Sequence, residues 1–286
     1  MATPIGNLED ISLRALRILK EADLVACEDT RHTAKLLSHY GVTTPRESHH
    51  EHNETVHTLR LLELLRSGSK IALVTDAGMP LVSDPGYLLV SACRKEAIPV
   101  VPIPGPSAVV TALAASGLAA DSFHFAGFLP SRSDARRRKL KELSGMLATL
   151  VIFEAPHRVM KSLEDMAEVL GPRQACLARE VTKIHEEFIH GTLPEILETL
   201  QRRPRVRGEI TLVIDRGEAA KEVSAWPVSI GEHVKEEMAR AGTSRNEALK
   251  SVARRRGISR RQAYRLLVDE KGATNCTNKG GHELHE

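Results

Sequence analysis

The sequence predicts an α/β protein, because short apolar runs alternate along most of the chain with segments of helical spacing. Leucines three residues apart, such as Leu13, Leu16 and Leu19, indicate amphipathic helices between the runs. Several of the runs are apolar at every position, which indicates strands buried on both faces of a sheet. The strands predicted in this way are 23–26, 71–75, 99–103, 150–153, 175–178 and 210–214.

The chain of 286 residues is longer than one average domain and is expected to form two α/β domains with an appendage. The segment "GLAADSFHFAGFLPSRSDARRR" interrupts the alternation near Gly117, and "RGEAAKEVSAWP" is typical of a linker. The polar end "GATNCTNKGGHELHE" is expected to be disordered. The predicted parts are an N-terminal domain (1–117), a second domain (118–217), a linker (218–228), a basic helical extension (229–271) and a tail (272–286).

The extension contains "SRNEALKSVARRRGISRRQAYRLL", in which Ser244 with Glu247 and Ser259 with Gln262 each predict a capped helix start. The result is a small helix-turn-helix-like unit. It is either an amphipathic structural appendage or a module that docks nucleic acid. Arginines around its turn favour the second interpretation. The side chains expected to form its apolar face are Ala248, Leu249, Val252, Ala253, Ala263, Leu266 and Leu267.

Charge and cysteine usage narrow the classes of protein. The net charge is only +3, but basic residues cluster at 132–141, 202–207 and 235–265, either as solvated helix faces or as contacts for a polyanion. The four cysteines form no C-x-x-C pair, which argues against a zinc knuckle or a disulfide framework. No signal peptide or long apolar stretch is present, so we expect a cytoplasmic protein without a membrane segment.

Glycine- and proline-rich loops follow several strands, namely "TDAGMP", "PIPGPSA" and "FEAPH". Ligands of open α/β sheets bind at the carboxyl ends of strands, and Asp76 is placed there to accept hydrogen bonds from a ribose or an amino group. The phosphate-binding patterns of kinases and nicotinamide enzymes are missing, and so is the G-x-S-x-G elbow of hydrolases. The loops therefore predict a different small-molecule site.

Two further loops are rich in polar groups. In "SHHEHNE", His50 and His52 project from the same face of an extended segment, but no third metal ligand is evident, and a loop that faces the substrate or solvent is the alternative. In "EDTRHT", Glu28 and Asp29 follow a strand, where Asp29 forms either a site or an internal ion pair with Arg31. "HEEFIH" has the wrong spacing for a zinc protease, and no metal site is predicted.

Eight motifs occur in order: "ATPIGNLEDIS", "CEDTRHT", "HEHN", "DAGMPLVSDPGY", "PIPGPSA", "EAPHR", "TKIHEE" and "GEITLVI". With them the chain resembles the ribosomal RNA small subunit methyltransferase I family of the tetrapyrrole methylase superfamily, over residues 2 to about 215. The resemblance implies two α/β domains of the tetrapyrrole methylase type that hold S-adenosylmethionine in the interdomain cleft. It also implies methylation of the ribose 2'-hydroxyl of a cytidine in the decoding region of 16S ribosomal RNA, by a homodimer.

The resemblance also assigns residues. It implies cofactor contacts from Asp76, Ala77, Gly78, Met79, Ser107, Ala108, Phe153 and Glu154. Removal of the hydroxyl proton needs a base, for which we favour Glu28 and Asp29 over His50, His52 and Lys183. The residues expected to contact substrate RNA are Arg31, His50, His52, Lys183, Arg255, Arg256, Arg260 and Arg261.

The chain departs from the family pattern at two places. The family's short strand before "ATPIGN" does not appear in the given sequence, so either the start is placed too late or the strand is lost, and its loss would expose a sheet edge and reduce core packing. Met79 stands where the family commonly has threonine. Two competing functions are a superfamily relative's substrate, either a tetrapyrrole or a modified histidine, and a non-catalytic RNA-binding or assembly role. The arginine-rich extension argues against a tetrapyrrole substrate. A measurement of S-adenosylmethionine binding distinguishes an enzyme from a non-catalytic protein.

Overall fold

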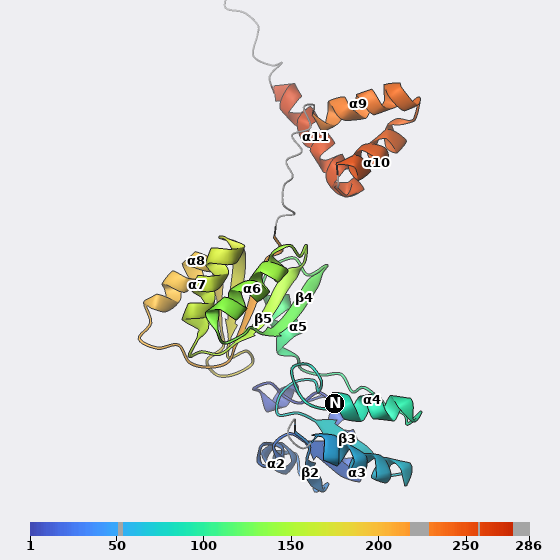
Figure 1. Cartoon of the computed structure of the whole chain (residues 1–286), viewed down its shortest axis with the longest axis vertical. Helices are drawn as coiled ribbons and strands as arrows, with labels where there is room; N and C mark the ends of the chain where they lie inside the picture. Colours follow the sequence, from blue (N-terminus) through green and yellow to red (C-terminus); the bar gives the residue numbers. More distant parts are fainter. Residues whose placement is uncertain (51–53, 218–228, 257, 277–286) are drawn as a thin grey trace, which may run out of the picture. The chain divides into compact units, whose positions relative to one another are not determined.

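The computed structural model describes residues 1–50, 54–217, 229–256 and 258–276. It divides into two compact units, Met1–Gly217 and Glu218–Glu286 (Figure 1). The division after Gly217 coincides with the predicted start of the linker. No helix in the described ranges combines the length and the apolar character that crossing a membrane requires.

The first unit begins with a parallel sheet of three strands in the order β2-β1-β3. These strands are β1 (Leu24–Cys27), β2 (Arg46–Ser48) and β3 (Ile71–Val74). The surrounding helices are η1 (Leu8–Asp10), α1 (Leu13–Glu21), α2 (Thr30–His39), α3 (Glu54–Arg66) and α4 (Tyr87–Lys95). Two of the predicted strands, 23–26 and 71–75, thus match β1 and β3 closely.

Alternate residues of these strands face opposite layers of helices. Val25 and Cys27 pack in a core with α1 and α2, while Ala26 packs with α3 and α4. Since side chains of a strand point alternately to the two faces, continuous apolar strands are what a sheet covered on both sides requires.

The predicted strand at 99–103 is wrong, because this segment pairs with none of the strands in the described part of the chain. Its prolines, Pro99 and Pro102, lack the N–H group that a sheet ladder needs. Instead, the carbonyl oxygen of Ile103 accepts a hydrogen bond from the Ala2 N–H (3.2 Å). The apolar composition of 99–103 predicted a strand but carried no information about whether a neighbouring strand is there to pair with it.

An apolar cavity of about 700 Å³ lies beside the edge strand β3. Its walls include β3, the segment 98–103 and Met1. The N-terminal ammonium of Met1 donates to the Leu73 carbonyl oxygen (2.7 Å), and burial lowers its pKa to about 6.

The second half of this unit is a sheet of five strands in the order β4-β5-β8-β6-β7. The pair β4·β5 is parallel, and the other pairs are antiparallel. Its strands are β4 (Phe123–Phe128), β5 (Thr149–Glu154), β6 (Gln174–Arg179), β7 (Glu187–Thr192) and β8 (Ile210–Ile214). The edge strands β4 and β7 were not predicted, because both are only partly buried and lack a continuous run of aliphatic residues.

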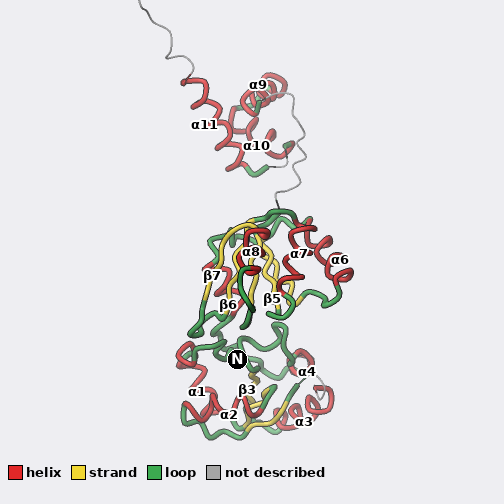
Figure 2. Tube along the Cα trace, turned by 90° about the vertical axis from the view of Figure 1, so that its left-hand side faces the viewer, coloured by secondary structure: helices red, strands yellow, loops and turns green. Residues whose placement is uncertain are grey.

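Helices cover both faces of this sheet. Leu150 and Ile152 point into a core formed with α6 (Ser133–Ser144), α7 (Val159–Leu170) and α8 (Leu193–Gln201), which Figure 2 shows gathered over the strands. Val151 points to the opposite face, where α5 (Ala108–Ala115) and Ile5 pack. The N-terminal segment therefore contributes to the core of the second half.

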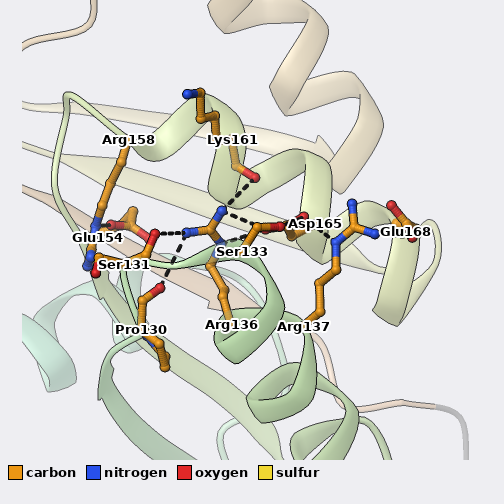
Figure 3. A network of polar contacts seen from close by, with 10 residues as sticks. All are labelled: Pro130, Ser131, Ser133, Arg136, Arg137, Glu154, Arg158, Lys161, Asp165 and Glu168. Carbon is orange, nitrogen blue, oxygen red and sulfur yellow. Dashed lines mark hydrogen bonds and ion pairs between the residues drawn. The ribbon is translucent and has the colours of Figure 1, made fainter.

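A buried ion-pair network joins α6 to α7 (Figure 3). Arg136 donates from Nε to Asp165 Oδ2 (2.7 Å) and from Nη1 to the carbonyl oxygens of Pro130 (3.3 Å) and Ser131 (3.0 Å). Arg137 also contacts Asp165, on the other carboxylate oxygen (2.6 Å). Part of the basic cluster at 132–141 is therefore internal structure.

The second unit contains the helices α9 (Ile230–Ala241), α10 (Arg245–Arg255) and α11 (Arg260–Cys276). Both predicted capping interactions are present: the Ser244 hydroxyl accepts from the Glu247 N–H (3.4 Å), and the Ser259 hydroxyl accepts from the Gln262 N–H (3.2 Å).

The apolar face of this unit needs one correction. Leu266 is 48% exposed, because the buried stripe of α11 follows Ala263 and Leu267, one helical turn apart. Helix α11 also continues past the predicted boundary at 271, since extending a helix costs less than starting one.

Removing the Asp165 carboxylate should destabilise the protein strongly. Asp165→Ala leaves the Arg136 guanidinium, whose side chain is 3% exposed, buried without its counter-charge. We expect the free energy of unfolding to fall by about 3–5 kcal/mol, measured by denaturant titration. Glu168→Ala removes an exposed partner of Arg137 and should cost less than about 1 kcal/mol. Equal effects of the two variants would contradict a structural role for the buried pair.

Candidate active site

The carboxyl ends of the three parallel strands meet at one edge of the first sheet. Cys27 pairs with Ser48 on one side and with Val74 on the other, so the residues that follow these strands are neighbours. The structure thereby brings together Glu28–Asp29, His49–His50 and Asp76, and the Asp29 N–H donates to Asp76 Oδ1 (3.2 Å). His52 lies outside the described residues.

The loop after β3 is unusually constrained. Leu81 (φ 73°) and Ser83 (φ 68°) are non-glycine residues in the left-handed region, which costs energy and occurs often at functional sites. Gly78 (φ 80°) forms an antiparallel bridge with Thr3, with hydrogen bonds of 2.9 and 3.0 Å. Thr3 therefore anchors the start of this loop through its backbone.

A cavity of about 400 Å³ lies between this loop and the second half of the unit. On one side it is bounded by residues 77–79, 82–84 and 107–109, and on the other by 153–156 and 209–211. The predicted cofactor residues that line it are Ala77, Gly78, Met79, Ser107, Ala108, Phe153 and Glu154. Asp76 is absent from the lining, since its carboxylate lies toward Asp29.

Glu154 is the most deeply buried acid of this cavity, at 2% exposure. Its Oε1 accepts from the Ala155 N–H (2.8 Å) and from Arg158 Nε, as Figure 3 shows for the ion pair. Its Oε2 is buried and has no hydrogen-bond partner in the described part of the chain. A buried carboxylate oxygen without a donor is costly, but the Glu154 side chain is 0% exposed, so it would have to shift before a ligand in the cavity could donate to this oxygen.

The acids at the strand ends differ in their partners. Asp29 caps α2 by accepting the Arg31 N–H (2.8 Å), and its side chain pairs with the Arg31 guanidinium (2.8 Å). Those contacts hold the pKa of Asp29 well below its usual range. Burial, and next the charge of Asp76, raises the pKa of Glu28. The predicted catalytic pair thus divides into one firmly ionised acid and one that protonates more easily.

Sequence reasoning missed Asp84, which lies in the cavity wall. Burial raises its pKa to about 6, with further contributions from Glu28 and Asp76. Asp84 belongs to "DAGMPLVSDPGY", so its motif was recognised, but its neighbours are brought to it only by folding.

Lys183 lies in a loop that contacts the N-terminal segment. Its Nζ contacts Glu180 Oε1 (3.0 Å) and Glu209 Oε2 (3.1 Å). Burial favours the neutral amine, but the two carboxylates raise the pKa of Lys183 overall. An ammonium held in this way is not suited to accept a proton.

The four arginines predicted to contact RNA in the second unit have two kinds of environment. Arg255 pairs with Glu237 (3.0 Å), and Arg256 donates to His233 Nδ1 (3.0 Å) and to the Ser229 carbonyl oxygen (3.0 Å). Arg260 and Arg261 are exposed at the start of α11. In the described ranges, no group of three or more His, Cys, Asp or Glu side chains is placed to hold a metal ion.

Comparisons with known proteins relate this chain to methyltransferases. The family model of Tetrapyrrole (Corrin/Porphyrin) Methylases matches residues 2–197. Ribosomal RNA small subunit methyltransferase I of Halalkalibacterium halodurans is 48% identical over 256 residues, which cover 88% of each chain. The protein of the same name from Vibrio cholerae is 50% identical over 214 residues, 74% of each chain.

Two solved structures share the fold. Diphthine synthase superposes with a TM-score of 0.58 at 16% identity, covering 74% of this chain and 87% of that chain. Uroporphyrin-III C-methyltransferase from Thermus thermophilus, complexed with S-adenyl homocysteine, gives a TM-score of 0.50 at 22% identity and covers 73% and 93%. At these identities the likeness concerns the fold alone.

The contact between Gly6 and Lys183 gives a prediction. A Cβ at Gly6 would lie 2.4 Å from Lys183 Cγ and 2.9 Å from Thr182 Oγ1. Gly6→Ala should therefore displace the 180–183 loop and lower the free energy of unfolding by about 1–3 kcal/mol in a denaturant titration. Gly145→Ala, where no atom lies within 4 Å, should stay within about 1 kcal/mol of the unaltered chain. A smaller effect at Gly6 than at Gly145 would contradict the close approach.

Proposed function

The chain belongs to the ribosomal RNA small subunit methyltransferase I family, and we propose that it methylates a ribose 2'-hydroxyl of small-subunit ribosomal RNA with S-adenosylmethionine as donor. The target is a cytidine in the decoding region of 16S RNA. The observation that carries the proposal is the cavity of about 400 Å³, which is lined by the loop after β3 on one side and by the end of β5 on the other. That volume lies within the range of small-molecule sites.

The residues of the cavity suit the methyl donor. After a shift of its buried side chain, Glu154 Oε2 would accept from one of the donor's N–H or O–H groups. Helix α5 starts at Ala108, just after Ser107, in the cavity wall. None of the described side chains caps that helix, so its first N–H groups suit an anionic group such as a carboxylate. Phe128 and Phe153 add apolar wall. Met79 lines the cavity too, so the replacement of threonine leaves a thioether there instead of a hydroxyl.

The reaction places two demands on this chain. Bound S-adenosylmethionine supplies a methyl group that is already activated on a sulfonium. The protein must hold the ribose hydroxyl in line with that group and accept its proton. The constrained loop after β3 and the partnered acids provide rigid positioning, while acids of raised pKa at the same edge provide proton acceptors.

We assign RNA binding to residues of both units. In the first unit, Arg31 and His50 lie at the strand-end edge, and Lys183 lies beside the N-terminal segment. In the second, Arg260 and Arg261 are exposed to solvent and can contact phosphates, whereas Arg255 and Arg256 hold α9 and α10 together.

The assembly we propose is a homodimer in the cytoplasm. Val56 (71%) and Leu59 (63%) on α3 and Tyr87 (68%) on α4 are exposed, more than expected for large apolar side chains without a partner. The free thiols of Cys27, Cys93 and Cys176 suit a reducing compartment. Sedimentation equilibrium tests the dimer through its mass.

The activity itself has a direct test. Incubated with tritiated S-adenosylmethionine and small ribosomal subunits that lack the modification, the chain should label the RNA, and nucleoside digestion should release 2'-O-methylcytidine. Label on a base, or none above that of heat-inactivated protein, would contradict the proposal.

The assignment of Glu154 predicts an effect on the cofactor. Glu154→Gln removes the charge of the buried acceptor, so the affinity for S-adenosylmethionine should fall at least about tenfold in calorimetry. Glu168→Gln alters an exposed acid of the same half and should leave the affinity unchanged. Equal affinities for all three proteins would contradict a contact between Glu154 and the cofactor.

The exposed arginines predict a salt effect. The slope of log affinity against log salt becomes shallower by about 0.7 to 0.9 for each phosphate that the protein no longer neutralises. Replacement of Arg260 and Arg261 by Ala should weaken RNA binding, reduce the slope by about 1.5, and leave cofactor affinity intact. Arg17→Ala, in an exposed pair with Glu21, serves as the control.

A shortened chain extends this test. Removal of residues 229–286 should weaken RNA binding further. An unchanged slope in both altered proteins would point instead to the basic segment 202–207.

A further inference from the structure

An exposed aromatic ring lies at the rim of the cofactor cavity. Phe128 lines this cavity and is 57% exposed. For its ribose to enter a cavity in a protein, a nucleotide must leave the base stack of the RNA, and its base then loses its stacking partners. Proteins that bind unstacked bases commonly offer them an aromatic side chain. The inference drawn from Phe128 rests on the proposed function and names a contact to the RNA substrate.

A register shift in β4 directs Phe128 toward the cavity. Phe125 pairs with Val151 of β5. Phe128 pairs with Phe153, which is two residues farther along β5, although Phe128 is three residues farther along β4. In a regular strand, side chains two residues apart share a face, so without the extra residue Phe128 would face α6 and α7. Shifts of this kind re-aim side chains beside active sites.

Gly127 occupies the shifted position. Its φ of 65° lies in the left-handed region, which glycine adopts at little cost. A Cβ at this position would lie 3.5 Å from Ser83 Oγ, so the backbone of β4 passes close to the loop after β3. The strand therefore carries Phe128 to a place where the two walls of the cavity approach each other.

Neighbouring side chains fix the orientation of the Phe128 ring. Its centroid lies 5.6 Å from that of Phe153, whose own ring makes an edge contact with Phe125 (4.8 Å). The Arg158 guanidinium lies over the Phe128 ring, 6.0 Å from its centroid. Glu154 holds this guanidinium from the other side in a buried ion pair (Figure 3). A ring held in this way loses little freedom when a flat ligand stacks on it.

Packing in the core does not account for the position of Phe128. The chain contains only five phenylalanines, and three of them, Phe125, Phe128 and Phe153, meet on this one face. Phe125 and Phe153 are partly buried and pack against the core around α5. Phe128 is instead more than half exposed, so most of its ring is available to a ligand.

The exposure of Phe128 favours the RNA over the cofactor as its partner. Phe153 already provides the cavity with an aromatic wall that is shielded from solvent. Phe128 and the half-buried Val82 are apolar side chains of the same cavity that RNA can reach from solution. Arg132, four residues after Phe128, is exposed and supplies a positive charge for the phosphates.

We propose that Phe128 is the stacking platform for the target nucleobase of the RNA. The base, once it has left its stack, lies against the exposed ring, and its ribose then lies at the mouth of the cofactor cavity. Stacking holds the nucleotide by the plane of its base, so Phe128 sets the affinity and the orientation of the nucleotide and takes no part in proton transfer. Because every base has a π face, the ring positions the nucleotide without selecting cytosine.

The test uses the full chain with small ribosomal subunits that lack the modification. Phe128→Leu keeps an apolar side chain but removes the flat ring, so the affinity for subunits, measured by filter retention, should fall about tenfold. KM for subunits should rise by a similar factor, with a smaller change in kcat. Phe128→Tyr keeps the ring and should bind subunits within about threefold of the unaltered chain. Both variants should bind S-adenosylmethionine within about threefold of the unaltered chain in calorimetry.

Phe123→Leu is the matched control. Phe123 lies on the same strand and is 45% exposed, but it is not among the residues that line the cavity. This variant should bind both subunits and cofactor as the unaltered chain does. Melting temperatures of the three variants check that each is folded.

The assignment would be overturned by a Phe128→Leu variant that binds subunits within about twofold of the unaltered chain, or by a Phe128→Tyr variant that binds them as weakly as Phe128→Leu. A loss of cofactor affinity in Phe128→Leu would assign the ring to the adenine of the cofactor instead. Failure of the proposed function has a different result. The unaltered chain would then bind subunits and cofactor without transferring a methyl group, while the difference in subunit binding between Phe128→Leu and Phe128→Tyr would remain.

Discussion

The site depends on the short N-terminal segment, which holds loops of both halves of the first unit in place. Thr3 pairs with Gly78 through two backbone hydrogen bonds, and its hydroxyl donates to the Thr75 carbonyl oxygen (3.0 Å). Farther along, the Asn7 N–H donates to Thr182 Oγ1 (3.1 Å), and Gly6 leaves room for Lys183. Ile5, between these contacts, packs into the core of the five-stranded sheet and also lines the cavity. The two walls of the cavity are thus set by one stretch of backbone, in which a side chain at position 6 has no room.

The acidic residues around this cavity have different roles, which depend on their partners. Asp29, Glu154 and Glu209 each have a cation within contact distance, and these ion pairs fix their loops. Glu28 and Asp84 have no such ion pair with any described residue, and burial together with neighbouring negative charge raises their pKa values. Environments that push the pKa values of nearby acids apart are how a single fold provides both fixed charges and proton acceptors.

Arginines divide in a similar way. Arg136 is buried at the centre of the α6–α7 network, and Arg255 and Arg256 connect helices of the second unit. Arg260 and Arg261 begin α11 on its exposed side. A basic cluster in a sequence therefore overstates the charge that a polyanion meets, because part of it is neutralised by folding.

The sequence by itself determined the features that depend on near neighbours. Apolar runs located both sheets, serines followed by Glu247 and Gln262 located two helix starts, and the ordered motifs predicted loops that line the cavity of about 400 Å³. Only the tertiary structure decided that 99–103 has no strand partner, that Asp76 lies toward Asp29, and that Asp84 shares a cavity with Glu154. The reason is physical: capping and periodicity act over a few residues, whereas strand pairing, burial and Coulomb interaction depend on groups far apart in the chain.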